Sequence, residues 1–348
     1  MKQSRKIKPR ISRINKKPFS AEPSLNLSKP EKRKISGILL LDKPQGISSN
    51  KALQIVKRIF SAEKCGHTGT LDPMATGLLP ICFGEATKFS SQLLGADKTY
   101  EAILKLGFHS TTGDAEGEIS RVAAVVKYPT ASTCEQVLEQ FIGTIKQTPP
   151  MYSALKHRGK PLYHYARNGD VIERQAREIK IYAIRILSLQ DDELHLSIRC
   201  GTGTYIRVLA QDIGQALGCE SAYLTGLRRT AIDLFEINQS IALAALEQID
   251  SAQRHQCLLP VDSLLKNFTP VTLDALATRY IVQGRTIPYL SNSCEKTTTA
   301  KTVRLYDEHQ QFIGLGEVSS GQQITAKRLL SNTCLAHTLT TDHTSSNE

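Results

Sequence analysis

A single carboxylate lies in a stretch of sequence that is otherwise free of charge. Between Cys65 and Gly84, Asp72 is the only formally charged side chain among glycine, threonine, proline and aliphatic residues. Pro73 disfavours the helical conformation of Asp72, which predicts an extended backbone there. Most aspartates in loops cap turns. The residue type alone therefore favours a structural role, with a reactive carboxylate as the alternative.

A carboxylate in an apolar loop needs a cation, because an unpaired buried charge is costly. The chain offers four candidates, Lys43, Arg207, Arg228 and Arg229, and their positions in the sequence do not choose among them. A glycoside hydrolase would need a second acid paired with Asp72. The surrounding loop contains none, so we expect no competing acid beside this carboxylate.

The motifs of other enzyme classes are missing. The sequence has no GxxxxGK[ST] or GxGxxG phosphate loop, and no HExxH or G-x-S-x-G motif. Its eight cysteines form no CxxC pair, which argues against zinc and, in a chain of this size, indicates a reducing compartment. We therefore expect no metal or organic cofactor. No secretory signal or membrane-spanning run is visible, so we expect a cytoplasmic protein.

Positive charge is concentrated at the N-terminus. Residues 1–34 carry eight Lys and four Arg against Glu22 and Glu31, which is +10 of the net charge of +11. Such a tail is typical of a segment that meets phosphates. A disordered solubilising extension is an equal alternative, and a transit peptide is a third, although four prolines disfavour a regular helix. We expect residues 1–34 to be a disordered tail.

A second basic segment extends from 147 to 180. It contains seven Lys and Arg residues against three acidic residues, with Tyr152, Tyr163 and Tyr165 interleaved. Basic residues mixed with aromatic rings suit RNA phosphates and stacked bases. A charged loop that faces solvent is the alternative.

Hydrophobic periodicity predicts an α+β protein with a small all-β unit after Pro260. The apolar run 35–42 predicts a buried strand, and Ser48 or Ser49 is expected to cap the helix after it. The Asp72 stretch is expected to be a loop, and Ser132 to Glu135 a capping box. The remaining predictions are a short helix at 85–94, strands at 99–107 and 193–200, a helix at 205–217 that ends at Gly218, and a hairpin of 302–306 and 311–318.

Several motifs together resemble the bacterial tRNA pseudouridine-55 synthase (TruB) family. They follow one another in the family's order over most of the chain, which makes coincidence very improbable: GHTGTLDPMATGLLP at 66–80, GILLLDKPQGISSN at 37–50, DKTY at 97–100, QTPPMYSALK at 147–156, GTYIR at 203–207, LRRT at 227–230, and GLGE and KRL at 314–317 and 327–329.

The resemblance implies an architecture. A pseudouridine synthase fold, a mixed and largely antiparallel sheet with flanking helices, would occupy residues 35–262, with an RNA-gripping thumb loop at 147–180. A PUA-like RNA-binding domain would occupy 263–332, and 333–348 would be a flexible end.

The resemblance also implies a reaction and its residues. The chain would isomerise uridine in the tRNA T loop, acting alone, as a monomer, and without a membrane or cofactor. Asp72 would be the catalytic carboxylate, either as nucleophile at C1′ or in a glycal route. Arg207 would keep it ionised, and Tyr100 would stack on the base and assist proton removal. The other expected substrate contacts are Tyr205 and Leu227 at the uracil and His67 at the flipped T loop.

Two alternatives stay open at this point. A guide-RNA-dependent dyskerin-type enzyme shares the aspartate loop, although Met74 and the 149–152 stretch fit the stand-alone type better. A non-catalytic tRNA-folding chaperone is the other, and the intact set of Asp72, Tyr100 and Arg207 disfavours it. Tyr223 stands where the family often has histidine. This difference bears on the local RNA contacts and not on the reaction.

Overall fold

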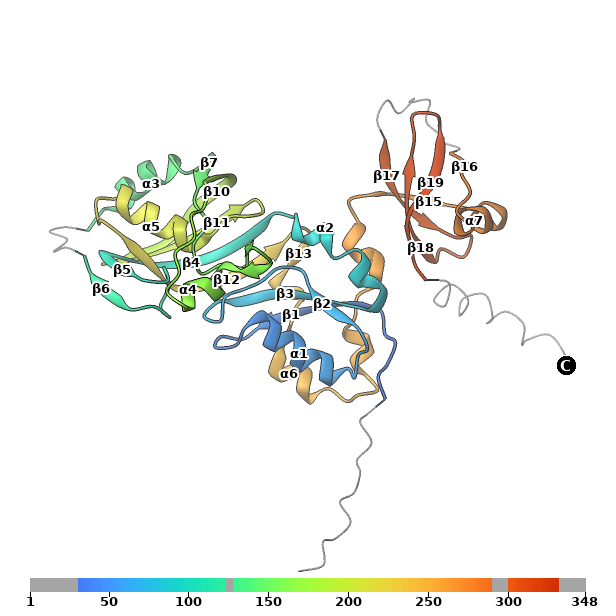
Figure 1. Ribbon diagram of the computed structural model, residues 1–348, viewed down its shortest axis with the longest axis horizontal. Coiled ribbons are helices and arrows are strands. Elements are labelled where there is room, and N and C mark those ends of the chain that lie inside the picture. The colour runs from blue at the N-terminus through green and yellow to red at the C-terminus, as the bar shows by residue number, and fades with distance from the viewer. Residues whose placement is uncertain (1–30, 123–127, 290–299, 332–348) are drawn as a thin grey trace, which may run out of the picture. The chain divides into compact units, whose positions relative to one another are not determined.

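The computed structural model describes residues 31–122, 128–289 and 300–331. The expectations for residues 1–30 of the basic tail and for 333–348 lie outside these ranges. A ten-stranded mixed sheet forms the larger part of the fold (Figure 1). Its strands along the path are β14 (Ile241–Ala242), β1 (Gly37–Lys43), β3 (Thr76–Phe83), β12 (Ala222–Ile232), β4 (Lys98–Leu106), β11 (Glu193–Cys200), β10 (Arg177–Gln190) and β7 (Gly143–Gln147), with β2 (Cys65–His67) beside β3 and β13 (Phe235–Glu236) beside β12.

Helices cover this sheet in two groups. α1 (Ser49–Ile59) and α6 (Leu243–Gln248) pack near β1, whereas α3 (Ala131–Glu139) and α5 (Ile206–Ala216) pack near β10 and β12 (Figure 1). The shorter pieces complete the list: η1 (Gly84–Lys88), α2 (Ser91–Leu94), β5 (Phe108–Ser110), β6 (Ile119–Arg121), β8 (Lys156–His157), β9 (Lys160–Pro161), α4 (Leu162–Arg167), η2 (Ile237–Gln239), η3 (Arg254–Cys257) and η4 (Val261–Leu265).

The apolar run that predicts the first strand forms β1 and is buried on both faces. Leu39 and Leu41 point into the main core, whereas Ile38 and Leu40 point into a second cluster. A strand buried on both faces has a continuous hydrophobic sequence rather than an alternating one. β3 shares this pattern and pairs antiparallel with β1. This rigid pair is what the Asp72 segment is attached to.

Two local predictions are wrong. The stretch 64–80 is not all loop, because β2 and β3 frame it and only 68–75 lies between strands. The cap of α3 is Thr130, whose side chain accepts a hydrogen bond from the Thr133 amide, so the capping-box assignment two residues later fails. In contrast, Ser48 caps α1 as expected, by accepting from the Lys51 amide.

The C-terminal part is a separate five-stranded sheet. Its strands are β15 (Thr269–Thr272), β17 (Lys301–Tyr306), β18 (Phe312–Val318), β19 (Gln323–Leu329) and β16 (Ile287–Pro288), joined by α7 (Ala275–Val282). The predicted hairpin is β17 and β18, which pair antiparallel around Asp307. Buried Val303, Leu305 and Ile313 are among the residues of its own hydrophobic core.

Gly77 in β3 is required by close backbone packing. Its φ is +101°, and a Cβ there would lie 2.3 Å from the carbonyl oxygen of Arg229 in the parallel neighbour β12. We predict that Gly77→Ala lowers the free energy of unfolding by at least about 2 kcal/mol, because the strand must shift.

Chemical denaturation of the full chain measures this loss. Gly95→Ala is the matched control, since a Cβ there would meet nothing within 4 Å and its φ is −82°. Equal stability of the two variants would contradict the prediction.

Candidate active site

The Asp72 segment is fastened to α1 by one buried serine. The Ser49 hydroxyl donates to the Leu71 carbonyl at 3.0 Å and accepts from the Leu71 amide at 2.8 Å. The Gly46 amide donates to the Pro73 carbonyl at 2.8 Å on the other side of Asp72. The backbone of the carboxylate is therefore held on both sides, which fixes the direction of its side chain.

Arg207 is the cation that pairs with Asp72. Its Nε lies 3.0 Å from Oδ2 and its Nη2 lies 3.4 Å from Oδ1, so the ion pair is bidentate. The remaining donors reach the carbonyls of Thr112 at 2.9 Å and Tyr152 at 2.7 Å. Arg207 is only 5% exposed and follows the first residue of α5. A guanidinium with five fixed donors suits this geometry in a way that lysine does not.

A second carboxylate lies next to this pair, contrary to the expectation of a lone acid. Asp114 is 2% exposed, and its Oδ2 lies 3.7 Å from Arg207 Nε. Its own Oδ1 accepts from the Glu116 amide at 3.1 Å. Asp114 is 42 residues from Asp72 in the sequence, so nothing local indicated it. Arg207 therefore serves two anions rather than one.

The pKa of Asp72 is raised above its ordinary value. Burial is the largest cause, and the charge of Asp114 adds to it, while Arg207 lowers the pKa by its charge and its hydrogen bond. Arg207 alone therefore does not set the direction of the Asp72 pKa shift, because the effect of burial is larger than the effect of the arginine. One third of the Asp72 side chain is exposed, and that part meets the cavities described next.

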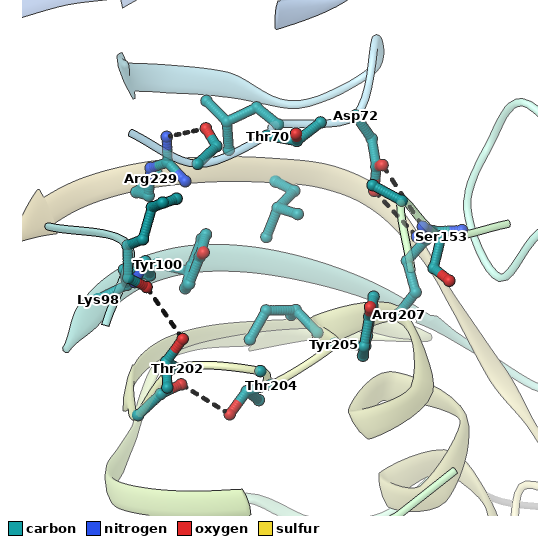
Figure 2. A pocket seen from close by; sticks show the side chains of 18 of the residues that line it. Thr70, Asp72, Lys98, Tyr100, Ser153, Thr202, Thr204, Tyr205, Arg207 and Arg229 are labelled. Atoms are coloured by element: carbon teal, nitrogen blue, oxygen red, sulfur yellow. Dashed lines mark hydrogen bonds and ion pairs between the residues drawn. The ribbon is translucent and has the colours of Figure 1, made fainter. Parts of the chain in front are cut away.

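The first cavity has a volume of about 270 Å³ and is drawn in Figure 2. Asp72, Tyr100, Tyr205, Leu227 and Arg207 all line it. Thus five of the six predicted site residues, which come from four separate parts of the chain, meet around one space. Tyr100 and Leu227 are both buried, with Leu227 9% exposed, and they form an apolar part of the wall between the charged groups.

Tyr205 is placed by the beginning of the basic segment. The Gln147 side chain accepts from the Tyr205 amide at 2.8 Å and donates to the Tyr205 carbonyl at 3.2 Å. Gln147 is 3% exposed. This double contact links β7 to the start of α5, and it fixes the backbone two residues before Arg207.

Two further cations line the same cavity. Lys98 and Arg229 lie beside Tyr100, at the end away from Asp72 and Arg207 (Figure 2). Arg229 is 1% exposed and donates from Nε to the Leu78 carbonyl at 2.8 Å. Arg229 was considered only as a partner of Asp72, and Lys98 was not singled out, although it lies two residues before Tyr100.

The other candidate cations have different partners. Arg228 pairs with Asp42, with Nη2 2.7 Å from Oδ2. Lys43 is fully buried, and its Nζ donates to the carbonyls of Ile47 at 2.7 Å and Pro44 at 2.9 Å. Burial lowers the pKa of Lys43 to about 8, while the nearby charge of Asp72 opposes that shift. Lys43 is therefore a buried neighbour of the Asp72 segment and not the ion-pair partner of Asp72.

His67 lies in an adjoining cavity of about 460 Å³ that shares Asp72 and Arg207 with the first. Burial and Arg229 lower the pKa of His67, which favours the neutral ring. Its Nδ1 accepts from the Gly69 amide at 3.4 Å. His67 thus does not line the cavity of Tyr100, but it lines the adjoining cavity together with Asp72.

The basic segment reaches this second cavity. Tyr163 and Arg167 of α4 line it, and the Arg167 guanidinium lies 5.5 Å from the centre of the Tyr163 ring. Tyr163 is 41% exposed. Tyr223 is different, because it is buried on β12 and its ring packs edge to face on Phe108. The position where the family often has histidine is therefore occupied here by a tyrosine that is packed inside the protein.

In the described ranges, no group of three His, Cys, Asp or Glu residues has the arrangement of a metal site. No helix there is long and apolar enough to span a membrane.

Comparisons with known proteins decide the family. The N-terminal domain of the TruB family of pseudouridylate synthases matches residues 57–206, and two C-terminal domains described for the same enzymes match 207–266 and 269–330. A protein of Nitrosospira multiformis named tRNA pseudouridine synthase B is 57% identical over 307 residues, 87% of this chain and 98% of the relative. The chain belongs to the TruB family. A protein of the same name from Neisseria meningitidis serogroup B is 50% identical, covering 84% and 93% of the two chains.

Solved structures agree on the fold of this TruB family member. A chain of a Cbf5–Nop10–Gar1 complex superposes with a TM-score of 0.63 at 25% identity, covering 84% of each chain. A chain of an H/ACA ribonucleoprotein bound to a substrate RNA gives the same score at 23% identity, covering 85% of each. The expected family, the pseudouridine synthase fold and the enzyme class are confirmed.

Asp114 should hold the pKa of Asp72 high, since its negative charge disfavours a second ionised carboxylate. We predict that Asp114→Asn, which keeps the side-chain shape, lowers the pKa of Asp72. Carboxyl NMR titration of the full chain with labelled aspartate measures it. Asp250→Asn, at an exposed position, is the control and should leave the Asp72 titration unchanged. An unchanged or higher pKa in Asp114→Asn would contradict this account.

Proposed function

We propose that this protein converts uridine to pseudouridine in the T loop of tRNA, at position 55. The observation that carries the proposal is the ion-paired carboxylate of Asp72 at one end of a cavity with an aromatic wall. The names of the relatives at 57% and 50% identity support tRNA as the substrate. In a folded T arm the uracil is stacked, so the nucleotide must be flipped out to reach such a cavity.

The cavity has the parts that a flipped uridine requires. Tyr100 offers a ring on which the base stacks, and such stacking recovers about 1–3 kcal/mol per base. Leu227 and Tyr205 close the sides of the pocket around the uracil. A base packed against these side chains limits water, which would otherwise compete for the sugar carbon.

Asp72 acts on the ribose in its ionised form. As a nucleophile it attacks C1′ while the N1–C1′ bond breaks, and in the glycal route it removes the C2′ proton instead. In either case the uracil turns over and C5 bonds to C1′, while the Asp72–C1′ bond breaks in the first route or Asp72 returns the proton to C2′ in the second. The C5 proton is then lost, with Tyr100 assisting, and N1 gains a proton. Arg207 lowers the cost of keeping the carboxylate charged in a desolvated site.

The RNA is gripped at the adjoining cavity, which Asp72 also lines. Tyr163 and Arg167 of the thumb segment and His67 surround the adjoining cavity, where the flipped region of the T loop would lie. A ring and a guanidinium on one short helix suit a base and a phosphate.

We infer that the protein works alone, as a monomer. The chain is 45–57% identical to several relatives named tRNA pseudouridine synthase B and 25% identical to the Cbf5 complex chain, which favours the stand-alone type over a guide-dependent one. A role in folding tRNA without catalysis would leave the Asp72–Arg207 pair without a purpose.

We predict that Asp72→Asn lowers pseudouridine formation by about 10⁴-fold or more, because the amide is neither nucleophile nor base. The substrate is an unmodified T-arm stem-loop with no guide RNA, and the product is mapped chemically. Binding of the stem-loop should persist, since the amide has the same shape. Asp170→Asn, at an exposed position of the thumb segment, is the control.

Loss of binding together with activity in Asp72→Asn would show that the carboxylate is structural. Absence of product with the unaltered chain, but product after adding a guide RNA, would favour the dyskerin-type alternative.

A further inference from the structure

The cavity has a charged group at each end, and only one end is explained by the sugar chemistry. We propose that Lys98 and Arg229 form a cationic base-binding end that stabilises the negative charge left on the uracil ring when the glycosidic bond breaks. This inference rests on the proposed function and assigns a role to two residues outside the predicted site.

Strand geometry brings these two cations to one place. Lys98 and Tyr100 are two residues apart on β4 and therefore share a face of the sheet. Arg229 is the cross-strand partner of Tyr100 on β12. All three line the cavity, and Figure 2 shows Lys98 and Arg229 on the side of Tyr100, with Asp72 and Arg207 on the other side.

Both cations are held by neutral oxygens. Lys98 Nζ donates to the carbonyls of Ala96 at 2.6 Å and Leu94 at 3.1 Å, and it lies 3.4 Å from that of Leu93. Arg229 donates to the carbonyls of Leu78 and Gly69, the second at 3.3 Å. These contacts fix the two heads and leave their charge in place.

No carboxylate forms an ion pair with either cation in the described ranges. Across the described ranges, neither Lys98 nor Arg229 has an acidic partner within 4.0 Å, whereas Asp97, beside Lys98 in the sequence, pairs with Arg199 at 3.5 Å. Arg229 is buried and Lys98 is partly buried, and two such like charges without a paired carboxylate are costly. The cost is offset during the reaction if an anion forms beside the two charges, because they then stabilise it.

The reaction supplies that anion by either route. When the N1–C1′ bond breaks, its electron pair stays on N1 and spreads to O2 and O4 of the uracil. This happens whether Asp72 bonds to C1′ or removes the C2′ proton. The charge disappears when C5 forms its bond to C1′, and the neutral product ring then forms by loss of the C5 proton and gain of a proton at N1. Lys98 and Arg229 act by their fixed positive field, with no proton transfer.

The charge on Lys98 depends on pH near neutrality. Burial, then the charge of Arg229, lower the pKa of Lys98 to about 8. The other titrating groups that face it are Asp97, Cys200 on β11 and Tyr100 on β4; the Cys200 thiol has a pKa raised to about 11 by burial, and the pKa of Tyr100 is raised as well. Lys98 is thus charged below about pH 8 and becomes neutral above it.

The experiment measures single-turnover cleavage of the glycosidic bond in T-arm stem-loops with uridine or 5-fluorouridine at the target. Lys98→Met should slow uridine by about 10- to 100-fold. The loss should be clearly smaller for 5-fluorouridine, because fluorine makes the base a better leaving group. Arg229→Gln should follow the same pattern. Lys105 lies farther along β4 and pairs with Asp192. Lys105→Met is the control and should leave both rates unchanged.

Lys98→Arg keeps the charge at every pH. It should retain most of the activity and remove the fall in rate that the unaltered chain shows as the pH rises through about 8. Equal losses on both substrates in Lys98→Met, with the same alkaline fall in Lys98→Arg, would overturn the inference and leave Lys98 a structural residue. If Lys98→Met does not fold, the pH profile of Lys98→Arg decides. An unaltered chain that makes no pseudouridine would refute the proposed function instead.

Discussion

The ion pair between Asp72 and Arg207 is the constraint on which the site depends. A carboxylate must stay charged at a site where burial and the charge of Asp114 both favour its protonation. The Arg207 guanidinium opposes this protonation by a bidentate ion pair with Asp72, while its other donors bind the carbonyls of Thr112 and Tyr152. The resulting carboxylate is charged but poorly solvated, which suits a group that must react with carbon rather than with water.

Much of the fold serves to hold this pair at one place. Ser49 at the start of α1 grips the backbone before Asp72, and Gln147 at the end of β7 grips the backbone before Arg207. Asp72 and Arg207 are 135 residues apart in the sequence. They meet because one sheet joins β1 and β3, through β12 and β4, to β11, β10 and β7, and because α5 packs on β12. Residues of the thumb segment line a second cavity that Asp72 and Arg207 also line.

The sequence predicted what local patterns encode. The run from 35 to 42, the Ser48 cap and the alternation from 99 to 107 are set by neighbouring residues, and the structure has them. Family motifs predicted which residues would gather around Asp72. Asp114 could not be found in this way, and Lys98, although it lies in the DKTY motif, could not be given a role, because both act through tertiary contacts. The net direction of the Asp72 pKa was likewise hidden, since burial is a property of the folded chain.

The most direct test of this account is the pH dependence of single-turnover pseudouridine formation in Arg207→Gln beside the unaltered chain. The unaltered chain should lose activity as the pH falls through the raised pKa of Asp72. Without the guanidinium that pKa rises further, so the acid limb of Arg207→Gln should move to higher pH and its rate should recover part of the loss as the pH increases. A rate that is lower by the same factor at every pH, with an unmoved acid limb, would contradict the claim that Arg207 keeps the carboxylate ionised.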